Sequence, residues 1–536
     1  MKKTYFPAAA VLLLFFASLA NAQEIVELKQ PSSNKVVIKL MFRNGSISDP
    51  AGKEGLTAFT TSMISDGGTK TMTKSQIDDA LYPWSAGIGA GVDKEVSIFT
   101  FECPSAYLDK FYPIMIDVVT APAFSKDDFA RIKSNQQNYV DEVIRSSSDE
   151  EYSKKALEDF LFRGTNYQHM VQGTSKGVQN ISLEDVMAHY KNFYTIKNVM
   201  IGVAGNYPAD FIAKLNKDLA KMGSSPAPIA QPVKPKMPEG LQVEIVQKDN
   251  ALGSAICMGF PIDITRSDNS FAALMVANSW LGEHRKSYSH LYKKIREERS
   301  MNYGDYSYIE WYENGGSNML PPPGVPRHSN YFSIWVRPVQ TAAGLKKQYP
   351  ELNDINIGHA HFAMRMALHE MQQLIDKGMS KEDFEATRTF LRSYMKLYIQ
   401  STERQLGYLM DSRFYGRKDY IAEMNDLLSK LTLDEVNAAM KKYWQTQNFY
   451  VTIVTDKTEA EPLKKSLEAN LASPMSYSNV LKSSLSPEIL KEDKEVEGYK
   501  LNVKSVAIIN SAETFKEPQQ KPSAPEKVVP EMKRTK

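Results

Sequence analysis

SLEDVMAHY (residues 182–190) and TLDEVNAAM (residues 432–440) are two copies of one pattern, separated by 432 − 182 = 250 residues. Each copy begins with a hydroxyl residue followed three positions later by an acid, the capping-box pattern that starts a helix. Each leads into a short apolar run, which begins near Val199 in the first copy and near Phe449 in the second. The repeat therefore predicts a helix followed by a strand in each half of the chain.

A second pair of segments agrees with this organisation. SKDDF (residues 125–129) matches SKEDF (residues 380–384), again a serine with an acid three positions later. Between the pairs lies a proline-rich stretch, residues 224–240, which favours an extended linker. We therefore expect an α+β fold with two homologous halves, residues 23–223 and 241–475, each a β-sheet covered by helices.

The composition limits the choice of partners. With 536 residues, 42% of them hydrophobic and 24% charged, the chain is long enough for two or more packed domains. Lys and Arg (65) nearly balance Asp and Glu (63), so charge gives no reason to expect a nucleic acid partner. Only two cysteines occur, Cys103 and Cys257, so a metal would need His and carboxylate ligands.

The two ends of the chain predict export and a polar tail. Residues 1–22 combine a basic start, an apolar stretch and a small-residue triplet ending at Ala22, a pattern typical of a secretory signal peptide. We expect cleavage near Ala22 and a periplasmic or secreted protein without stable membrane insertion. A membrane anchor is the alternative, but the apolar run is short for a span. The C-terminal extension, residues 476–536, ends in polar residues that we expect to be disordered.

Three further segments link the chain to a known family. They are RNGS (residues 43–46) after a strand-like run, GLTAFTTSM (residues 55–63) and LYKKIREERSMNY (residues 291–303). These segments resemble those of the pitrilysin or insulinase-type zinc peptidases, and the resemblance extends over almost the whole mature chain. It implies the two-half fold of the mitochondrial-processing-peptidase-like metallohydrolases, in agreement with the repeat.

Residues 55–63 depart from the family pattern. Active members carry HxxEH on this helix, where two His one turn apart bind zinc and the Glu serves as general base. The resemblance places Ala58, Thr61 and Ser62 at those positions, and none of them is a usual zinc ligand or base. We therefore expect no metal in this chain. Glu142 matches the family's downstream carboxylate ligand, although an ordinary surface carboxylate is the alternative interpretation.

The remaining histidines provide no second zinc motif. His359, His361 and His369 lie close together in the sequence, but no HxxEH or HxxxH pair exists among them. We expect ordinary histidines on a helix surface. His290 has no carboxylate at a ligand-like spacing in the sequence, so we expect no alternative zinc site there.

Arg296 and Tyr303 match a second functional element of the family. In the family, an Arg and a Tyr seven residues apart reach the substrate, and the Tyr hydroxyl helps to stabilise the oxyanion while the Arg holds the peptide backbone. Without the resemblance, a solvated basic helix face and a core tyrosine would be the simpler interpretation. A proline-rich insertion at residues 314–324 would present a stiff loop near the same site.

Two-chain members of the family combine a missing zinc motif with a retained Arg and Tyr, because one subunit carries zinc and its partner lacks it. The resemblance therefore implies a catalytically incomplete subunit of an exported heterodimeric zinc metallopeptidase. It would be inactive alone, with Zn expected in a homologous partner subunit and peptides as substrates. The alternative is a non-enzymatic peptide-binding or scaffold protein of the same fold, which grips extended peptides by strand addition.

Overall fold

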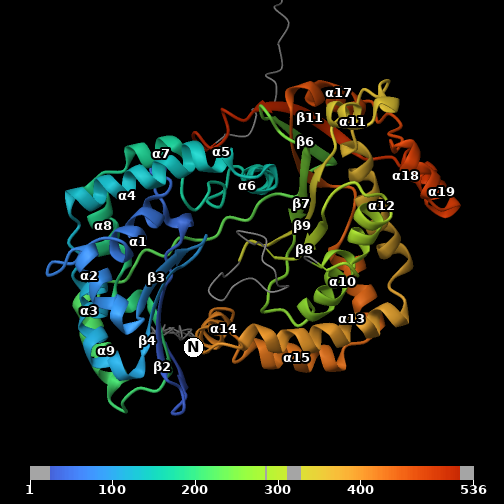
Figure 1. Cartoon of the computed structure of the whole chain (residues 1–536). Helices are drawn as coiled ribbons and strands as arrows, with labels where there is room; N and C mark the ends of the chain where they lie inside the picture. The colour runs from blue at the N-terminus through green and yellow to red at the C-terminus, as the bar shows by residue number, and fades with distance from the viewer. Residues whose placement is uncertain (1–23, 284–285, 311–327, 519–536) are drawn as a thin grey trace, which may run out of the picture.

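The computed structural model describes residues 24–283, 286–310 and 328–518. It contains two β-sheets on opposite sides of the molecule, each with helices packed on it (Figure 1). The predicted α+β fold with two similar halves is therefore confirmed. The predicted signal peptide, the 314–324 insertion and the end of the polar tail lie outside the described residues. Within those residues, no helix is both long and apolar enough to cross a membrane.

The first sheet has five strands in the order β1-β5-β2-β4-β3, with β2 antiparallel to both of its neighbours. Its strands are β1 (Ile25–Lys29), β2 (Lys35–Phe42), β3 (Gly87–Val92), β4 (Ser97–Pro104) and β5 (Val199–Gly205). The helices of this half are α1 (Leu56–Ser65), α2 (Lys74–Leu81), α3 (Leu108–Thr120), α4 (Lys126–Asn138), α5 (Ile144–Ser146), α6 (Asp149–Leu161), α7 (Ser175–Asn180), α8 (Leu183–Phe193) and α9 (Phe211–Leu219).

The second sheet has six strands in the order β11-β6-β10-β7-β9-β8. Its strands are β6 (Leu241–Gln247), β7 (Ser254–Pro261), β8 (Asp305–Tyr308), β9 (Tyr331–Val339), β10 (Phe449–Thr455) and β11 (Val503–Asn510). The helices of this half are α10 (Phe271–Gly282), α11 (Ala342–Gln348), α12 (Ala360–Lys377), α13 (Lys381–Tyr394), α14 (Thr402–Phe414), α15 (Tyr420–Lys430), α16 (Leu433–Tyr443), α17 (Lys457–Glu468), α18 (Asn479–Ser484) and α19 (Pro487–Val496).

The two sheets share one topology. The order β1-β5-β2-β4-β3 of the first half corresponds to β6-β10-β7-β9-β8 of the second, with β11 added beside β6. The repeated motif accounts for part of this likeness, because Ser182 and Thr432 form capping boxes with Asp185 and Glu435 at the starts of α8 and α16. These helices lead into β5 and β10, as predicted. The serines of the SKDDF and SKEDF segments likewise cap α4 and α13.

Each half contributes one helix to the sheet of the other half. Helix α6 packs on β7, β9 and β10 of the second sheet, and α14 packs on β1, β2 and β5 of the first (Figure 1). Leu157 of α6 lies in one apolar cluster with Cys257 and Trp335 of the second sheet. Met410 of α14 lies in another with Val37 of the first sheet. The two halves are therefore interlocked by apolar packing and not merely joined by the linker.

Ion pairs accompany this exchange. Arg163, which follows α6, donates to both carboxylate oxygens of Glu244 in β6, at 2.6 and 3.0 Å. Lys39 of β2 pairs with Glu403 of α14. Arg163 and Glu244 are both buried, so removing either partner would leave an uncompensated charge in the interior. These pairs make the contact between the halves specific as well as apolar.

The C-terminal extension connects the second sheet to the first half. After β11, which is parallel to β6, the chain runs back to the helices of the first half. There the backbone N–H of Ser175 donates to the Phe515 carbonyl at 3.0 Å. The Arg145 guanidinium donates to the Thr514 carbonyl at 2.7 Å. We call residues 511–517 the C-terminal strap.

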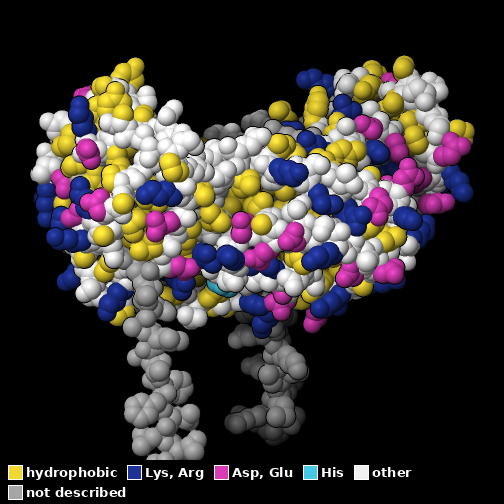
Figure 2. Space-filling view, turned by 90° about the horizontal axis from the view of Figure 1, so that it is seen from below, with side chains coloured by type: hydrophobic (Ala, Val, Ile, Leu, Met, Phe, Trp, Pro, Cys, Tyr) yellow, Lys and Arg dark blue, Asp and Glu magenta, His cyan; other side chains and the backbone are white. Residues whose placement is uncertain are grey.

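Charged side chains on the visible surface do not segregate by sign. On the face shown in Figure 2, Lys and Arg side chains are interspersed with Asp and Glu side chains. This distribution matches the near balance of 65 basic and 63 acidic residues. The expectation that nucleic acid is not a partner stays a prediction, and this face offers no extended basic field for one.

Replacing Met410 by Ala tests the packing between the halves. Met410 is fully buried against the first sheet, so we expect Met410→Ala to lower the free energy of unfolding by about 2–5 kcal/mol. Leu397→Ala is the matched control, because Leu397 is 45% exposed and should cost about 0.5 kcal/mol or less. Urea unfolding of both variants measures the two changes in the free energy of unfolding. Equal stability of the two variants would mean that α14 does not lock the halves together.

Candidate functional site

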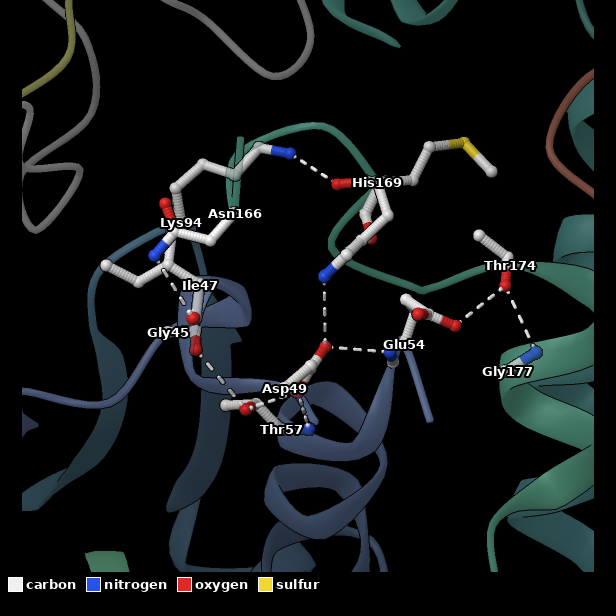
Figure 3. A network of polar contacts seen from close by, with 12 residues as sticks. Gly45, Ile47, Asp49, Glu54, Thr57, Lys94, Asn166, His169, Thr174 and Gly177 are labelled. Carbon is white, nitrogen blue, oxygen red and sulfur yellow. Dashed lines mark hydrogen bonds and ion pairs between the residues drawn. The ribbon is translucent and has the colours of Figure 1, made fainter. Parts of the chain in front are cut away.

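Helix α1, which carries the altered motif, is fixed at its first turn by Asp49. The Asp49 carboxylate accepts hydrogen bonds from the backbone N–H groups of Gly55 and Thr57, both at 2.7 Å, and from the Thr57 hydroxyl at 2.6 Å (Figure 3). His169 Nε2 lies 3.8 Å from the same carboxylate. Burial raises the pKa of Asp49, and neither His169 nor the hydrogen bonds fully offset it. Asp49 thus replaces the side-chain cap that Gly55 cannot provide.

The three residues of the altered motif line one cavity of about 870 Å³. Ala58 and Ser62 lie one turn apart on the helix face that borders it. The Thr61 hydroxyl is buried, donates to the Thr57 carbonyl at 2.9 Å and lies 2.7 Å from the Tyr194 hydroxyl. A methyl group and two hydroxyl groups stand where two imidazoles and a carboxylate would be needed. These three residues therefore do not fit a zinc ion.

The cavity has both polar and apolar walls and borders the edge of a sheet. Its walls come from α1, α2, α4 and the edge strand β3, and its charged residues are Asp66, Lys74, Asp78 and Arg131. Lys74 pairs with Asp78, and Arg131 donates to the backbone carbonyl of Asp66. The charges are therefore largely satisfied within the chain. A strand edge beside such a cavity suits an extended peptide better than a small ion.

Glu142 lies apart from this cavity. It belongs to the π-helical turn Tyr139–Val143 after α4, is exposed, and does not line the cavity that Tyr139 reaches. Arg145 stabilises this turn, since its guanidinium donates to the carbonyls of Val140 and Asp141 at 2.6 and 2.7 Å. Across residues 24–283, 286–310 and 328–518, no group of three or more His, Cys, Asp or Glu side chains is arranged to hold a metal ion.

Two histidines of the α12 region are buried, so the prediction of surface histidines is wrong for them. His359 Nε2 lies 2.9 Å from the Ser476 carbonyl, and His361 Nδ1 lies 2.8 Å from the Ser466 hydroxyl. Burial lowers the pKa of His359 to about 4 and that of His361 to about 3. Both rings are therefore neutral at neutral pH. The sequence gives no sign of this, because the burying residues come from α17 and from the segment after it.

Glu370 joins two histidines that are far apart in the sequence. His290 Nε2 lies 2.6 Å from one oxygen of the Glu370 carboxylate, and His369 Nδ1 lies 2.8 Å from the other. Burial opposes ionisation of Glu370, but these hydrogen bonds outweigh it and hold the pKa of Glu370 well below its usual range. Trp280 stacks on His290, with ring centres 4.3 Å apart. His290 thus has a carboxylate partner, which its sequence surroundings did not reveal.

The structure brings Arg296 and Tyr303 together. Arg296 lies in the π-helical segment Tyr292–Glu297, and Tyr303 lies in the turn before β8. The guanidinium carbon of Arg296 is 5.8 Å from the centre of the Tyr303 ring. Tyr303 is 77% exposed, which excludes the interpretation of this residue as a core aromatic. Both side chains are available to another molecule.

The buried guanidinium of Arg299 anchors the same segment. It donates to Asp493 at 2.8 Å and to Glu492 at 2.6 Å, both on α19. Lys294 also reaches Glu492, at 2.8 Å. The basic residues of this segment therefore do not form one solvated face. The C-terminal extension supports the backbone from which Arg296 and Tyr303 project, a role that no motif in the sequence indicated.

Comparison with known proteins identifies the family. The model described as "Insulinase (Peptidase family M16)" matches residues 24–175, and the one described as "Peptidase M16 inactive domain" matches residues 180–391. The chain belongs to the insulinase family of peptidases. Together with the altered motif on α1, these matches support an inactive, peptidase-like member of the family.

Individual relatives agree with this assignment. The chain is 22% identical over 440 residues to the "Uncharacterized zinc protease YmxG" of Bacillus subtilis (strain 168), covering 81% of this chain and 96% of the relative. Its fold is similar to that of a peptidase M16 inactive domain from Pseudomonas fluorescens, with a TM-score of 0.68, 18% identity, and 81% and 96% of the two chains covered. A protease from Helicobacter pylori gives a TM-score of 0.65 at 13% identity, with 80% and 96% covered.

Zinc analysis tests the altered motif. We expect the purified chain to carry no stoichiometric zinc after mild chelation, because Ala58 and Ser62 replace both imidazoles. The double change Ala58→His and Ser62→His places two imidazoles one turn apart at the cavity, so it should bind added zinc more tightly than the wild-type chain. It should still lose this zinc on mild chelation, because Glu142 lies apart from the cavity and supplies no third ligand. The single variant Ala58→His is the control and should stay near the wild-type content. Near-equimolar zinc in the wild-type chain would contradict the assignment.

The buried histidines predict a loss of stability in mild acid. The folded pKa of His361 is about 3, below its ordinary 6.5, so the unfolded chain binds the extra proton. The free energy of unfolding should therefore fall as the pH drops below about 6.5. His361→Gln should reduce this slope by about 1.4 kcal/mol per pH unit, as measured by urea unfolding between pH 4.5 and 7. Ser466→Ala, which removes only the hydrogen-bond partner, should leave the slope unchanged, and an unchanged slope in His361→Gln would refute the prediction.

Proposed function

We propose that this chain is the catalytically incomplete subunit of an exported, two-chain zinc metallopeptidase, where it closes the chamber over peptide substrates. The observation that carries the proposal is the contact between the half-buried Arg296 and the exposed Tyr303 on a supported segment. Helix α1 of the same chain lacks every zinc-binding side chain. A homologous partner subunit would hold the zinc and the general base. Proteolysis would then belong to the pair, and this chain would need no cofactor of its own.

Arg296 and Tyr303 have complementary chemistry for a peptide. The Tyr303 hydroxyl can donate a hydrogen bond to a carbonyl oxygen as negative charge develops on it. The Arg296 guanidinium can hold a neighbouring carbonyl of the peptide in the ground state and the transition state alike. The guanidinium carbon of Arg296 lies 5.8 Å from the centre of the Tyr303 ring, so both groups can contact the same peptide. The hydrogen bond of Arg299 to α19 limits movement of the segment between them.

Export is part of the proposal and rests on residues 1–22. The basic start, the apolar stretch and the small-residue triplet ending at Ala22 support cleavage there. The assembled pair would accordingly act in the periplasm or outside the cell, on peptides or on unfolded segments of other proteins.

A non-enzymatic peptide-binding or scaffold protein is the second candidate. Strand β3 borders the cavity and lies at the edge of its sheet, with no further strand beyond it in the described part of the chain. An extended peptide can pair with such an edge through main-chain hydrogen bonds and stay intact. This function would need neither Arg296 nor Tyr303.

Purification of the untagged chain from its native host separates the two candidates. A copurifying homologue with an intact HxxEH motif, together with zinc and peptidase activity in the same fraction, is the expected result. A chain that elutes alone, binds peptides and leaves them uncleaved would favour the scaffold.

Two substitutions test the roles of Arg296 and Tyr303 in the assembled enzyme. Tyr303→Phe removes one oxyanion donor and keeps the ring, so turnover should fall by about 10²-fold while assembly is unaffected. Arg296→Ala should mainly raise the Michaelis constant, because a guanidinium on a peptide carbonyl acts in both states. Lys293→Ala, a change at an exposed neighbour, is the control. Wild-type turnover in a stably assembled Tyr303→Phe pair would show that this chain takes no part in the chemical step.

A further inference from the structure

Strand β3 has an uncommon sequence for a sheet edge. It reads GIGAGV, with glycines at alternate positions 87, 89 and 91. Because side chains alternate across a strand, the three glycines share one face. In register they stand opposite Glu102, Thr100 and Ile98 of β4, on the face of the sheet to which α14 also packs. That face of β3 carries no side chain.

The other face of β3 is occupied by the chain itself. Ile88 packs against the apolar core of the first half, opposite Phe101 of β4. Ala90 and Val92 follow it on this face, and together with the backbone of Gly89 and Gly91 they form a wall of the cavity beside α1. The two faces of β3 therefore differ in chemistry, since one carries the side chains of Ile88, Ala90 and Val92 and the other is bare backbone.

The free edge of β3 lacks the usual protection against strand pairing. Natural edge strands are commonly blocked by Lys, Pro or a bulge, and GIGAGV contains none of these. Alternate residues of an antiparallel edge strand direct their N–H and carbonyl groups outward. Gly89 and Gly91 are exposed, and in the described part of the chain β4 is the strand that pairs with β3. The edge is thus open to an extended segment from another molecule.

The backbone of this chain does not require these glycines. None of the three has a positive φ, and a Cβ atom on Gly89 or Gly91 would meet no atom within 4 Å. Glycine in a strand costs about 0.5–1 kcal/mol relative to Ala, so the fold alone gives no reason for three of them. A bare face opposite Ile98 and Thr100 instead leaves room for large side chains of a neighbouring strand, the arrangement in which an aromatic ring covers a cross-strand glycine.

We infer that Gly87, Gly89 and Gly91 determine which peptides bind at this edge: extended segments with bulky apolar residues at every second position and polar residues between them. The bulky side chains would cover the glycines and reach the β4 residues behind them. The intervening polar side chains would face the cavity, where Asp66, Lys74 and Arg131 offer polar contacts. This inference rests on the proposed handling of peptides and names their class, the amphipathic strand segments of unfolded proteins.

Peptide binding to the full mature chain tests the inference. Two fluorescent eight-residue peptides of equal composition are compared by anisotropy, one with Phe and Val alternating with Ser and Lys, the other with the same residues in blocks. We expect the alternating peptide to bind at least about tenfold more tightly, because only its bulky side chains all fall on one face. Equal affinity for both peptides would overturn the inference and leave peptide binding itself standing.

A substitution at the strand provides the second measurement. Gly89→Val fills the bare face in open space, so thermal stability should be unchanged or slightly higher, while affinity for the alternating peptide should fall by about tenfold or more. Gly498→Val is the matched control, since a Cβ atom there also meets nothing within 4 Å. Unchanged affinity in a folded Gly89→Val chain would refute the role of the glycines. If neither peptide binds, the inference fails, and zinc and activity in the native-host fraction still decide the proposed function.

Discussion

The exchange of α6 and α14 between the two halves is the packing constraint on which the rest of the structure depends. Each sheet has its own helices on one face, and the other face is partly covered by a helix from the opposite half. Neither half can bury its inner face alone, so apolar packing sets the relation between the halves. Because α14 packs on β1, β5 and β2, the glycine face of β3 at the far edge of the sheet stays outside this contact.

Both elements of the candidate site are supported by residues to which the sequence analysis assigned no role. Asp49 fixes the first turn of α1 from outside the helix, and Arg299 anchors the Arg296–Tyr303 segment on α19. The loss of zinc ligands has therefore not been accompanied by a loss of order around α1. An intact scaffold around an altered motif is the pattern expected of a protein that still binds or positions something there.

The sequence patterns predicted those features of the fold that depend only on residues close together in the chain. The capping residues Ser182 and Thr432 identified the two related helices because a hydroxyl and an acid three positions later satisfy the first N–H groups wherever the helix lies. Contacts between distant segments were not predictable in this way. The burial of His361 depends on α17, and the pairing of His290 with Glu370 joins segments 80 residues apart. The exchange of α6 and α14 was missed for the same reason, since an apolar helix face does not reveal which sheet it covers.

The C-terminal strap has a consequence for the order in which the chain can fold. During synthesis the N-terminal segments of a chain appear first. They can fold completely only if the segments they pack against have also been made. Here the inner face of the first sheet is covered only after α14 has been made. The turn that contains Arg145 gains its hydrogen bond to Thr514 only when the chain is complete nearly to the end of its described part. Strand β6 likewise remains an unpaired edge until β11 arrives. A nascent or truncated chain therefore exposes unpaired strand edges until synthesis is nearly complete, and such edges can pair with other chains.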